Sequence, residues 1–165
     1  MKLGCIAALA LLVAAPSWAA GSAGVTVVLP KGWHELRLAV PPPGMKVGDP
    51  VTRIAVASAP IDFGPRGCND VDYAFSNTAV AIVVLEWVRR TPGVRWAPRP
   101  HRFTAKTLPI MRPPAIECFD GPGGSVQFQD HGRRFAAFVL LGRKAPPGLA
   151  RRARGVLDTL RVGPA

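Results

Sequence analysis

The stretch 125-SVQFQDHGRRFAAFVLLG-142 contains two strand-like runs separated by His131 and Gly132. Glycine accepts a positive φ freely, and histidine tolerates it better than most residues, so this pair suits a two-residue hairpin turn. If Asp130 faces Arg133 across the turn, apolar side chains fall opposite one another and share one face of the hairpin. These side chains are Val126, Phe128, Phe135, Ala137, Val139 and Leu141. The stretch therefore predicts an antiparallel hairpin with one buried face.

The opposite face of this hairpin is polar near the turn, where Gln127, Gln129 and Arg134 lie. Farther along the second run, Phe138 and Leu140 also fall on this face. We therefore expect the far end of the hairpin to be covered on both sides.

Four further segments are predicted to be strands. The run 25–29 is rich in β-branched residues, and the segments 34–40 and 53–58 alternate apolar and polar residues with a period of two. The segment 79–88 is almost entirely apolar and is predicted to be a central strand covered on both faces, with a buried helix as the alternative. The proline-rich region 89–114 predicts a loop or an irregular edge segment.

The segment 149–160 follows Pro146-Pro147-Gly148 and is predicted to be an amphipathic helix. Its apolar stripe consists of Leu149, Ala153, Val156, Leu157 and Leu160. The expected fold is therefore of the α+β class: an antiparallel sheet with a C-terminal amphipathic helix packed on one face and one disulfide.

The first residues, 1-MKLGCIAALALLVAAPSWA-19, have the charge, apolar run and small residues of a secretory signal peptide. We predict cleavage after Ala19, which leaves a single secreted or extracytoplasmic domain over 20–165 and no stable membrane span. An uncleaved anchor is the alternative. Cys5 precedes most of the apolar run, which argues against lipidation.

Removal of residues 1–19 would leave one pair of cysteines, Cys68 and Cys118. In an oxidising compartment, a disulfide between them is the expected state. Closing a loop of about 50 residues contributes about 4 kcal/mol in the chain-entropy model. A metal site or a redox pair is the alternative, although the close ligand pairs typical of zinc sites are missing.

The chain is basic, with 21 Lys and Arg against 10 Asp and Glu and a formal net charge of +11. Such a charge governs solubility and nonspecific contacts more than fold. A solvated basic surface is one interpretation. The other is an anionic partner, either an envelope polymer or lipid headgroups, with nucleic acid less favoured. The candidate contact residues are Arg133, Arg134, Arg151, Arg154 and Arg161.

No complete catalytic motif occurs in the sequence. His34-Glu35 lacks the second histidine of the zinc-protease motif, and Asp70-Val71-Asp72 lacks the glycine and closing glutamate of a calcium loop. Nothing in the sequence indicates a metal or a cofactor. The three histidines, His34, His101 and His131, have local structural explanations, yet a triad assembled in space remains open.

Two end segments together resemble PsbP-like domains: Val27-Val28-Leu29-Pro30-Lys31-Gly32-Trp33 near the start and Val156-Leu157-Asp158-Thr159-Leu160-Arg161-Val162 near the end. This resemblance implies an antiparallel sheet covered by helices and an accessory or binding role, without a matched site residue. The middle of the chain resembles small secreted proteins of GC-rich Gram-positive bacteria.

We therefore expect a noncatalytic secreted or cell-envelope binding module that contacts an anionic polymer or a protein partner. One alternative is a small-ligand-binding domain with its pocket between helix and sheet. The other is a hydrolase whose site combines His101 or His131 with an acid such as Asp70 or Glu117.

Overall fold

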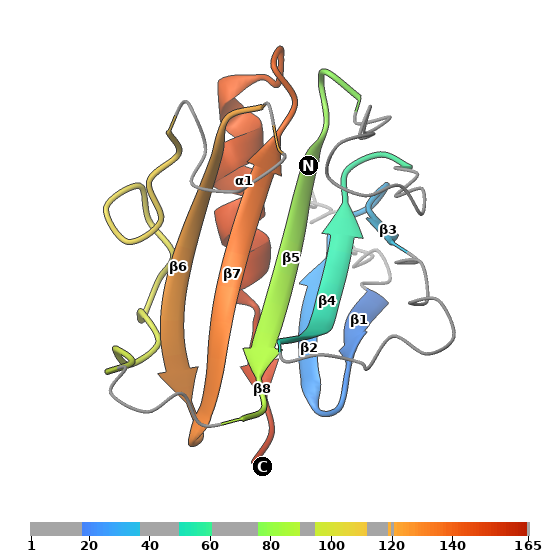
Figure 1. Ribbon diagram of the computed structural model, residues 1–165. Helices are drawn as coiled ribbons and strands as arrows, with labels where there is room; N and C mark the ends of the chain where they lie inside the picture. The colour runs from blue at the N-terminus through green and yellow to red at the C-terminus, as the bar shows by residue number, and fades with distance from the viewer. Residues whose placement is uncertain are drawn as a thin grey trace, which may run out of the picture.

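The computed structural model describes residues 18–36, 50–60, 76–89, 95–111, 119 and 121–164. In these ranges the chain forms two antiparallel sheets and one helix (Figure 1). The elements are β1 (Trp18–Ser22), β2 (Val25–Leu29), β3 (His34–Glu35), β4 (Val51–Ala57), β5 (Val80–Trp87), β6 (Gly123–Asp130), β7 (Arg133–Leu141), α1 (Pro147–Asp158) and β8 (Arg161–Val162). The predicted α+β class is confirmed.

The larger sheet has five strands in the order β3-β4-β5-β7-β6. Its central strand, β5, is buried on one face through Val80, Ile82 and Val84. On the other face Ala81 is buried, whereas the residues from Val83 onward are half-buried. The prediction of a central strand is therefore confirmed, its second face is fully covered only at Ala81, and the helical alternative for this segment is wrong.

The β6–β7 hairpin has the predicted register, with Asp130 opposite Arg133 and Phe128 opposite Phe135. His131 and Gly132 form the two-residue turn with φ angles of 48° and 75°. Both values lie in the left-handed region that a type I′ turn requires. The hairpin predicted from its turn residues and its alternating apolar residues is therefore confirmed.

The smaller sheet was not predicted as a separate sheet. It has the order β1-β2-β8, and β1 pairs with β2 around a turn at Ala23-Gly24. The expected single sheet divides in two because β2 takes its partners from residues 18–22 and 161–162 rather than from the larger sheet. The cleavage site predicted after Ala19 falls inside β1, and Ala20 is part of the core.

Helix α1 packs, beside the smaller sheet, on the face of the larger sheet that carries Phe128 and Phe135, which we call the inner face. In Figure 1 the helix lies behind the larger sheet. Pro147 occupies its first turn, where a missing N–H costs no helical hydrogen bond. The predicted stripe packs into the core through Ala153, Val156 and Leu157, joined just beyond the helix by Leu160. The helix therefore joins the two sheets through one hydrophobic core.

Several predictions fall outside the described residues. These are the leader up to residue 17, the strand segment 37–40, and the residues Cys68, Asp70, Glu117 and Cys118. The disulfide therefore stays a prediction. Among the helices in the described ranges, none is long and apolar enough to cross a membrane.

Candidate functional site

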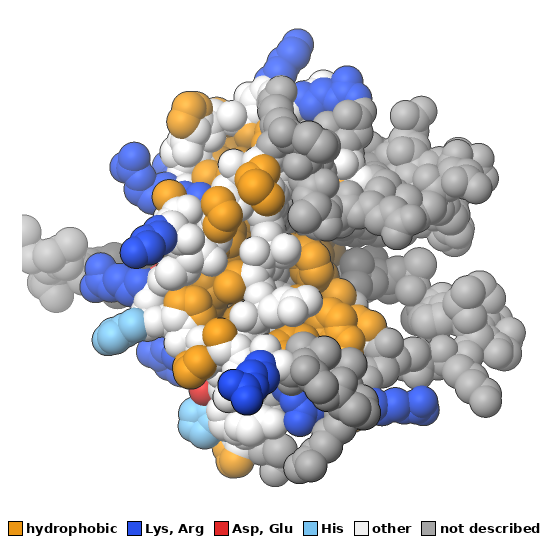
Figure 2. Space-filling model, turned by 60° about the vertical axis from the view of Figure 1, so that its left-hand side comes forward, with side chains coloured by type: hydrophobic (Ala, Val, Ile, Leu, Met, Phe, Trp, Pro, Cys, Tyr) orange, Lys and Arg blue, Asp and Glu red, His pale blue; other side chains and the backbone are white. Residues whose placement is uncertain are grey.

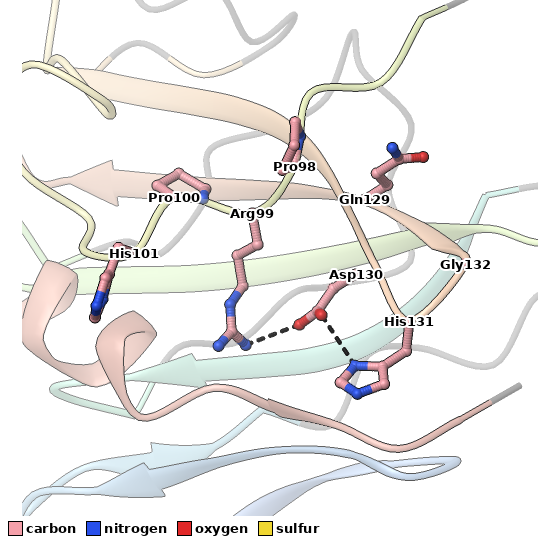
Figure 3. Close-up of a pocket in the computed structure, with 8 residues that line it drawn as sticks. All are labelled: Pro98, Arg99, Pro100, His101, Gln129, Asp130, His131 and Gly132. Atoms are coloured by element: carbon pink, nitrogen blue, oxygen red, sulfur yellow. Dashed lines mark hydrogen bonds and ion pairs between the residues drawn. The ribbon is translucent and has the colours of Figure 1, made fainter.

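A polar depression lies at the turn of the β6–β7 hairpin (Figure 3). Its volume is about 640 Å³. We call it the turn depression; it is lined by Pro98, Arg99, Pro100, His101, Gln129, Asp130, His131 and Gly132. It is therefore formed where the segment 98–101 runs past the hairpin turn.

Backbone hydrogen bonds hold the segment 98–101 against the edge of β6. The amide of Gln129 donates to the carbonyl of Ala97 at 2.7 Å, and the amide of Arg99 donates to the carbonyl of Gln129 at 2.9 Å. Farther along, the rings of Phe103 and Phe128 pack edge to face with centroids 5.8 Å apart. For the described residues 95–111, these contacts confirm the prediction of an irregular edge segment, and they position Arg99 beside the turn.

Three side chains form a connected polar chain across the turn depression. Arg99 Nη1 lies 2.9 Å from Asp130 Oδ2, and His131 Nδ1 lies 2.9 Å from Asp130 Oδ1, as the dashed lines in Figure 3 mark. A carboxylate only accepts hydrogen bonds, so the neutral imidazole carries its proton on Nδ1. Asp130 therefore orients both the guanidinium and the imidazole.

The guanidinium of Arg99 also donates from Nη1 to the carbonyl of Leu160 at 3.0 Å, just beyond the C-terminal end of α1. Arg161 donates to the same carbonyl at 3.3 Å. Two guanidinium groups thus meet at one carbonyl beside the depression. Figure 2 shows histidine side chains close to Lys and Arg side chains on this face of the molecule.

The five arginines predicted as partner contacts do not lie on one surface. Arg134 is half-buried on the outer face of the larger sheet, and Arg151 is exposed on α1. Arg154 donates twice to the carbonyl of Leu108, and burial lowers the pKa of its guanidinium. Arg161 lies beside the turn depression. Among these four, Arg161 alone shares a hydrogen-bond acceptor with a residue that lines the turn depression.

The fifth, Arg133, is buried, with 8% of its surface exposed. Its Nε and Nη2 donate to the two carboxylate oxygens of Glu86 at 2.7 Å each, and Nη1 donates to the carbonyl of Ala23 at 3.1 Å. A second bond from Nη1 reaches the carbonyl of Gly163 at 3.4 Å. The side chain of Arg133 is therefore bonded within the interior, and its prediction as a partner contact is wrong.

Glu86 also pairs with Arg53, whose Nε lies 2.5 Å from Oε2. The pairing of β4 with β5 is irregular between Thr52 and Ile54, and a bulge of this kind redirects the side chain that it carries. The hydrogen bonds from Arg133 lower the pKa of Glu86; burial opposes this, and Arg53 lowers it further. A buried Arg53–Glu86–Arg133 cluster thus joins the two sheets.

This cluster predicts acid-sensitive stability. Because the folded-state pKa of Glu86 lies below its ordinary value of 4.5, its contribution is fully present above pH 4.5 and is lost as pH falls through the folded pKa. The free energy of unfolding, measured by urea denaturation at a series of pH values below 4.5, should fall more steeply for the native chain than for Glu86→Gln. Parallel pH profiles would contradict this expectation.

The three histidines differ in position. His101 and His131 both line the turn depression, whereas His34 lies exposed on β3 at the opposite edge of the larger sheet. The acid beside His131 is Asp130, which the hydrolase hypothesis did not name. The described residues contain no cluster of three or more His, Cys, Asp or Glu side chains able to hold a metal ion.

The inner face of the larger sheet and α1 meet through tightly buried side chains. Phe128, Phe135, Leu157 and Leu160 are each fully buried there. This packing counts against a ligand pocket between helix and sheet in the described part of the chain. The depression found at the hairpin turn lies elsewhere.

Sequence reasoning missed Arg99 and Glu86. Arg99 sits in a Pro-Arg-Pro run that carries no periodic pattern, so only the fold shows that it reaches Asp130. Glu86 carried a usable signal, because it is a lone acid in phase with the buried residues Val80, Ile82 and Val84. Comparisons of this chain with protein-family models, with curated proteins and with solved structures found no match.

Proposed function

We propose that this protein is a noncatalytic binding module of a secreted or cell-envelope compartment, and that it binds an anionic polymer through the turn depression. The observation that carries the proposal is the hydrogen bonding of the Arg99 guanidinium. Its Nη1 is fixed by Asp130 and the carbonyl of Leu160, and no other hydrogen bond from this guanidinium occurs within the described ranges. Nε and Nη2 thus remain available as oriented donors.

The surroundings of Arg99 favour an anionic ligand. Arg161 shares the carbonyl of Leu160, and His101 and His131 line the same depression. Only one acid, Asp130, is among the lining residues, and it is already paired on both oxygens. The basic net charge of the chain adds long-range attraction for polyanions.

The lining residues favour binding over covalent catalysis. None of the eight lining residues carries a hydroxyl or a thiol, so the depression itself offers no nucleophile of the serine or cysteine type. His131 paired with Asp130 could orient a ligand through its second ring nitrogen without bond cleavage.

Substitution of Arg99 by glutamine should weaken binding to anionic polymers at least about tenfold, since hydrogen bonds to charged groups contribute about 1.5–3 kcal/mol. Binding would be measured by isothermal titration calorimetry or surface-immobilised polymer at several salt concentrations. The native affinity should fall steeply as salt rises, because screening shortens the range of exposed charges.

Arg151→Gln is the matched control, since Arg151 is an exposed arginine on α1 outside the turn depression. It makes the same change in net charge and should leave most of the affinity intact. Equal losses from the two substitutions would indicate nonspecific charge attraction instead of a site. Failure of the native protein to bind any polyanion at low salt would refute the proposed function.

A further inference from the structure

Resting on the proposed function, we infer that the turn depression selects anionic saccharides, in which a ring hydroxyl lies next to a carboxylate, sulfate or phosphate oxygen. The inference comes from the combination of an acceptor and a donor in one site. His131 supplies the acceptor and Arg99 supplies the donor.

The acceptor is Nε2 of His131. Asp130 accepts a hydrogen bond from Nδ1 at 2.9 Å, and this bond holds the neutral imidazole in the tautomer that leaves Nε2 unprotonated. The side chain is 59% exposed, so Nε2 is open to a ligand. An unprotonated ring nitrogen accepts a hydrogen bond from a hydroxyl and gains nothing from a bare anionic oxygen.

The position of His131 in the turn supports a role for its side chain. Type I′ turns favour Asn, Asp and Gly at this position because the residue needs a positive φ, here 48°. Histidine is not the best residue for the turn itself. Its ring, however, contacts Asp130, which in turn pairs with Arg99.

The donor is the free edge of the Arg99 guanidinium, whose side chain is 31% exposed. Pro98 and Pro100 flank it in the chain, and their rings line the same depression as apolar walls. A saccharide ring presents C–H groups to such walls, hydroxyls to Nε2 and an anionic oxygen to the guanidinium. A polyphosphate or a polycarboxylate without hydroxyls engages only Arg99.

The test compares two polyanions: polygalacturonate, which carries carboxylates and ring hydroxyls, and poly-glutamate, which carries carboxylates and no hydroxyls. His131→Asn keeps a residue suited to the turn and removes Nε2. This variant should bind polygalacturonate about tenfold more weakly than the native protein and poly-glutamate equally well. His34→Asn, on the far edge of the sheet, should change neither affinity.

The outcomes separate this inference from the proposed function. If His131→Asn binds both polymers like the native protein, saccharide selectivity is refuted, while anion binding through Arg99 stands. If the native protein prefers poly-glutamate, or single-stranded nucleic acid, the ligand class is wrong. If no polyanion binds, both proposals fail. Thermal unfolding of each variant verifies that it is folded.

Discussion

Glu86→Gln is expected to lower the free energy of unfolding by about 3–5 kcal/mol, the usual cost of removing one partner from a buried ion pair. Glutamine has nearly the same shape but no charge, so Arg133 would keep its buried guanidinium without the carboxylate that now receives two of its bonds. Against a typical domain stability of about 5–15 kcal/mol, this loss is large. Urea denaturation followed by tryptophan fluorescence would measure it.

The exposed Glu35→Gln on β3 provides the control for the loss of one acid and should change the stability little. The double variant Glu86→Leu with Arg133→Met tests the mechanism. Apolar replacement of a whole buried pair is often close to neutral, so the double variant should be more stable than Glu86→Gln alone. A single variant as stable as the native chain would show that the cluster contributes little.

Phe128→Ala should cost about 3–5 kcal/mol through lost burial and the cavity that remains. The ring is fully buried, stacks on Phe135 with centroids 5.5 Å apart and packs edge to face with Phe103 at 5.8 Å. Its removal acts on both the hairpin and the segment that carries Arg99. Differential scanning calorimetry and urea denaturation would give the loss.

Phe138→Ala is the matched control for this substitution. Phe138 lies on the other face of the same hairpin and is only half-buried, so its truncation should cost clearly less. If both variants lose the same stability, the aromatic stack around Phe128 has no special weight. If Phe128→Ala loses less than about 1 kcal/mol, the cavity account is wrong.

Sequence reasoning performed best where the determining contacts are local. The turn at His131-Gly132 and the alternation on either side specify both register and buried face within eighteen residues of sequence. The helix was equally accessible, since its stripe and the preceding prolines lie together in the chain. Local signals of this kind need no knowledge of the remaining fold.

Nonlocal features were less accessible. Arg133 was predicted to be a partner contact on the basis of its charge, although it alternates in phase with the buried residues Phe135 and Ala137. This phase indicated a buried arginine. Its partner, Glu86, lies 47 positions away in the sequence, and the sequence alone does not pair the two residues. The division into two sheets escaped prediction because β1 lies partly in residues assigned to the leader.

The reach of Arg133 has a consequence for the order in which the molecule assembles. Its guanidinium donates hydrogen bonds to the carbonyl of Ala23, 110 positions away, and to the carbonyl of Gly163, 30 positions away. A hairpin such as β6–β7 closes a loop of a few residues and forms on the microsecond timescale. Pairings between distant segments form more slowly, because closing a long loop costs more conformational entropy. We therefore expect the β1–β2 ribbon, which is marginal by itself, to dock on the rest of the fold after the β6–β7 hairpin has formed.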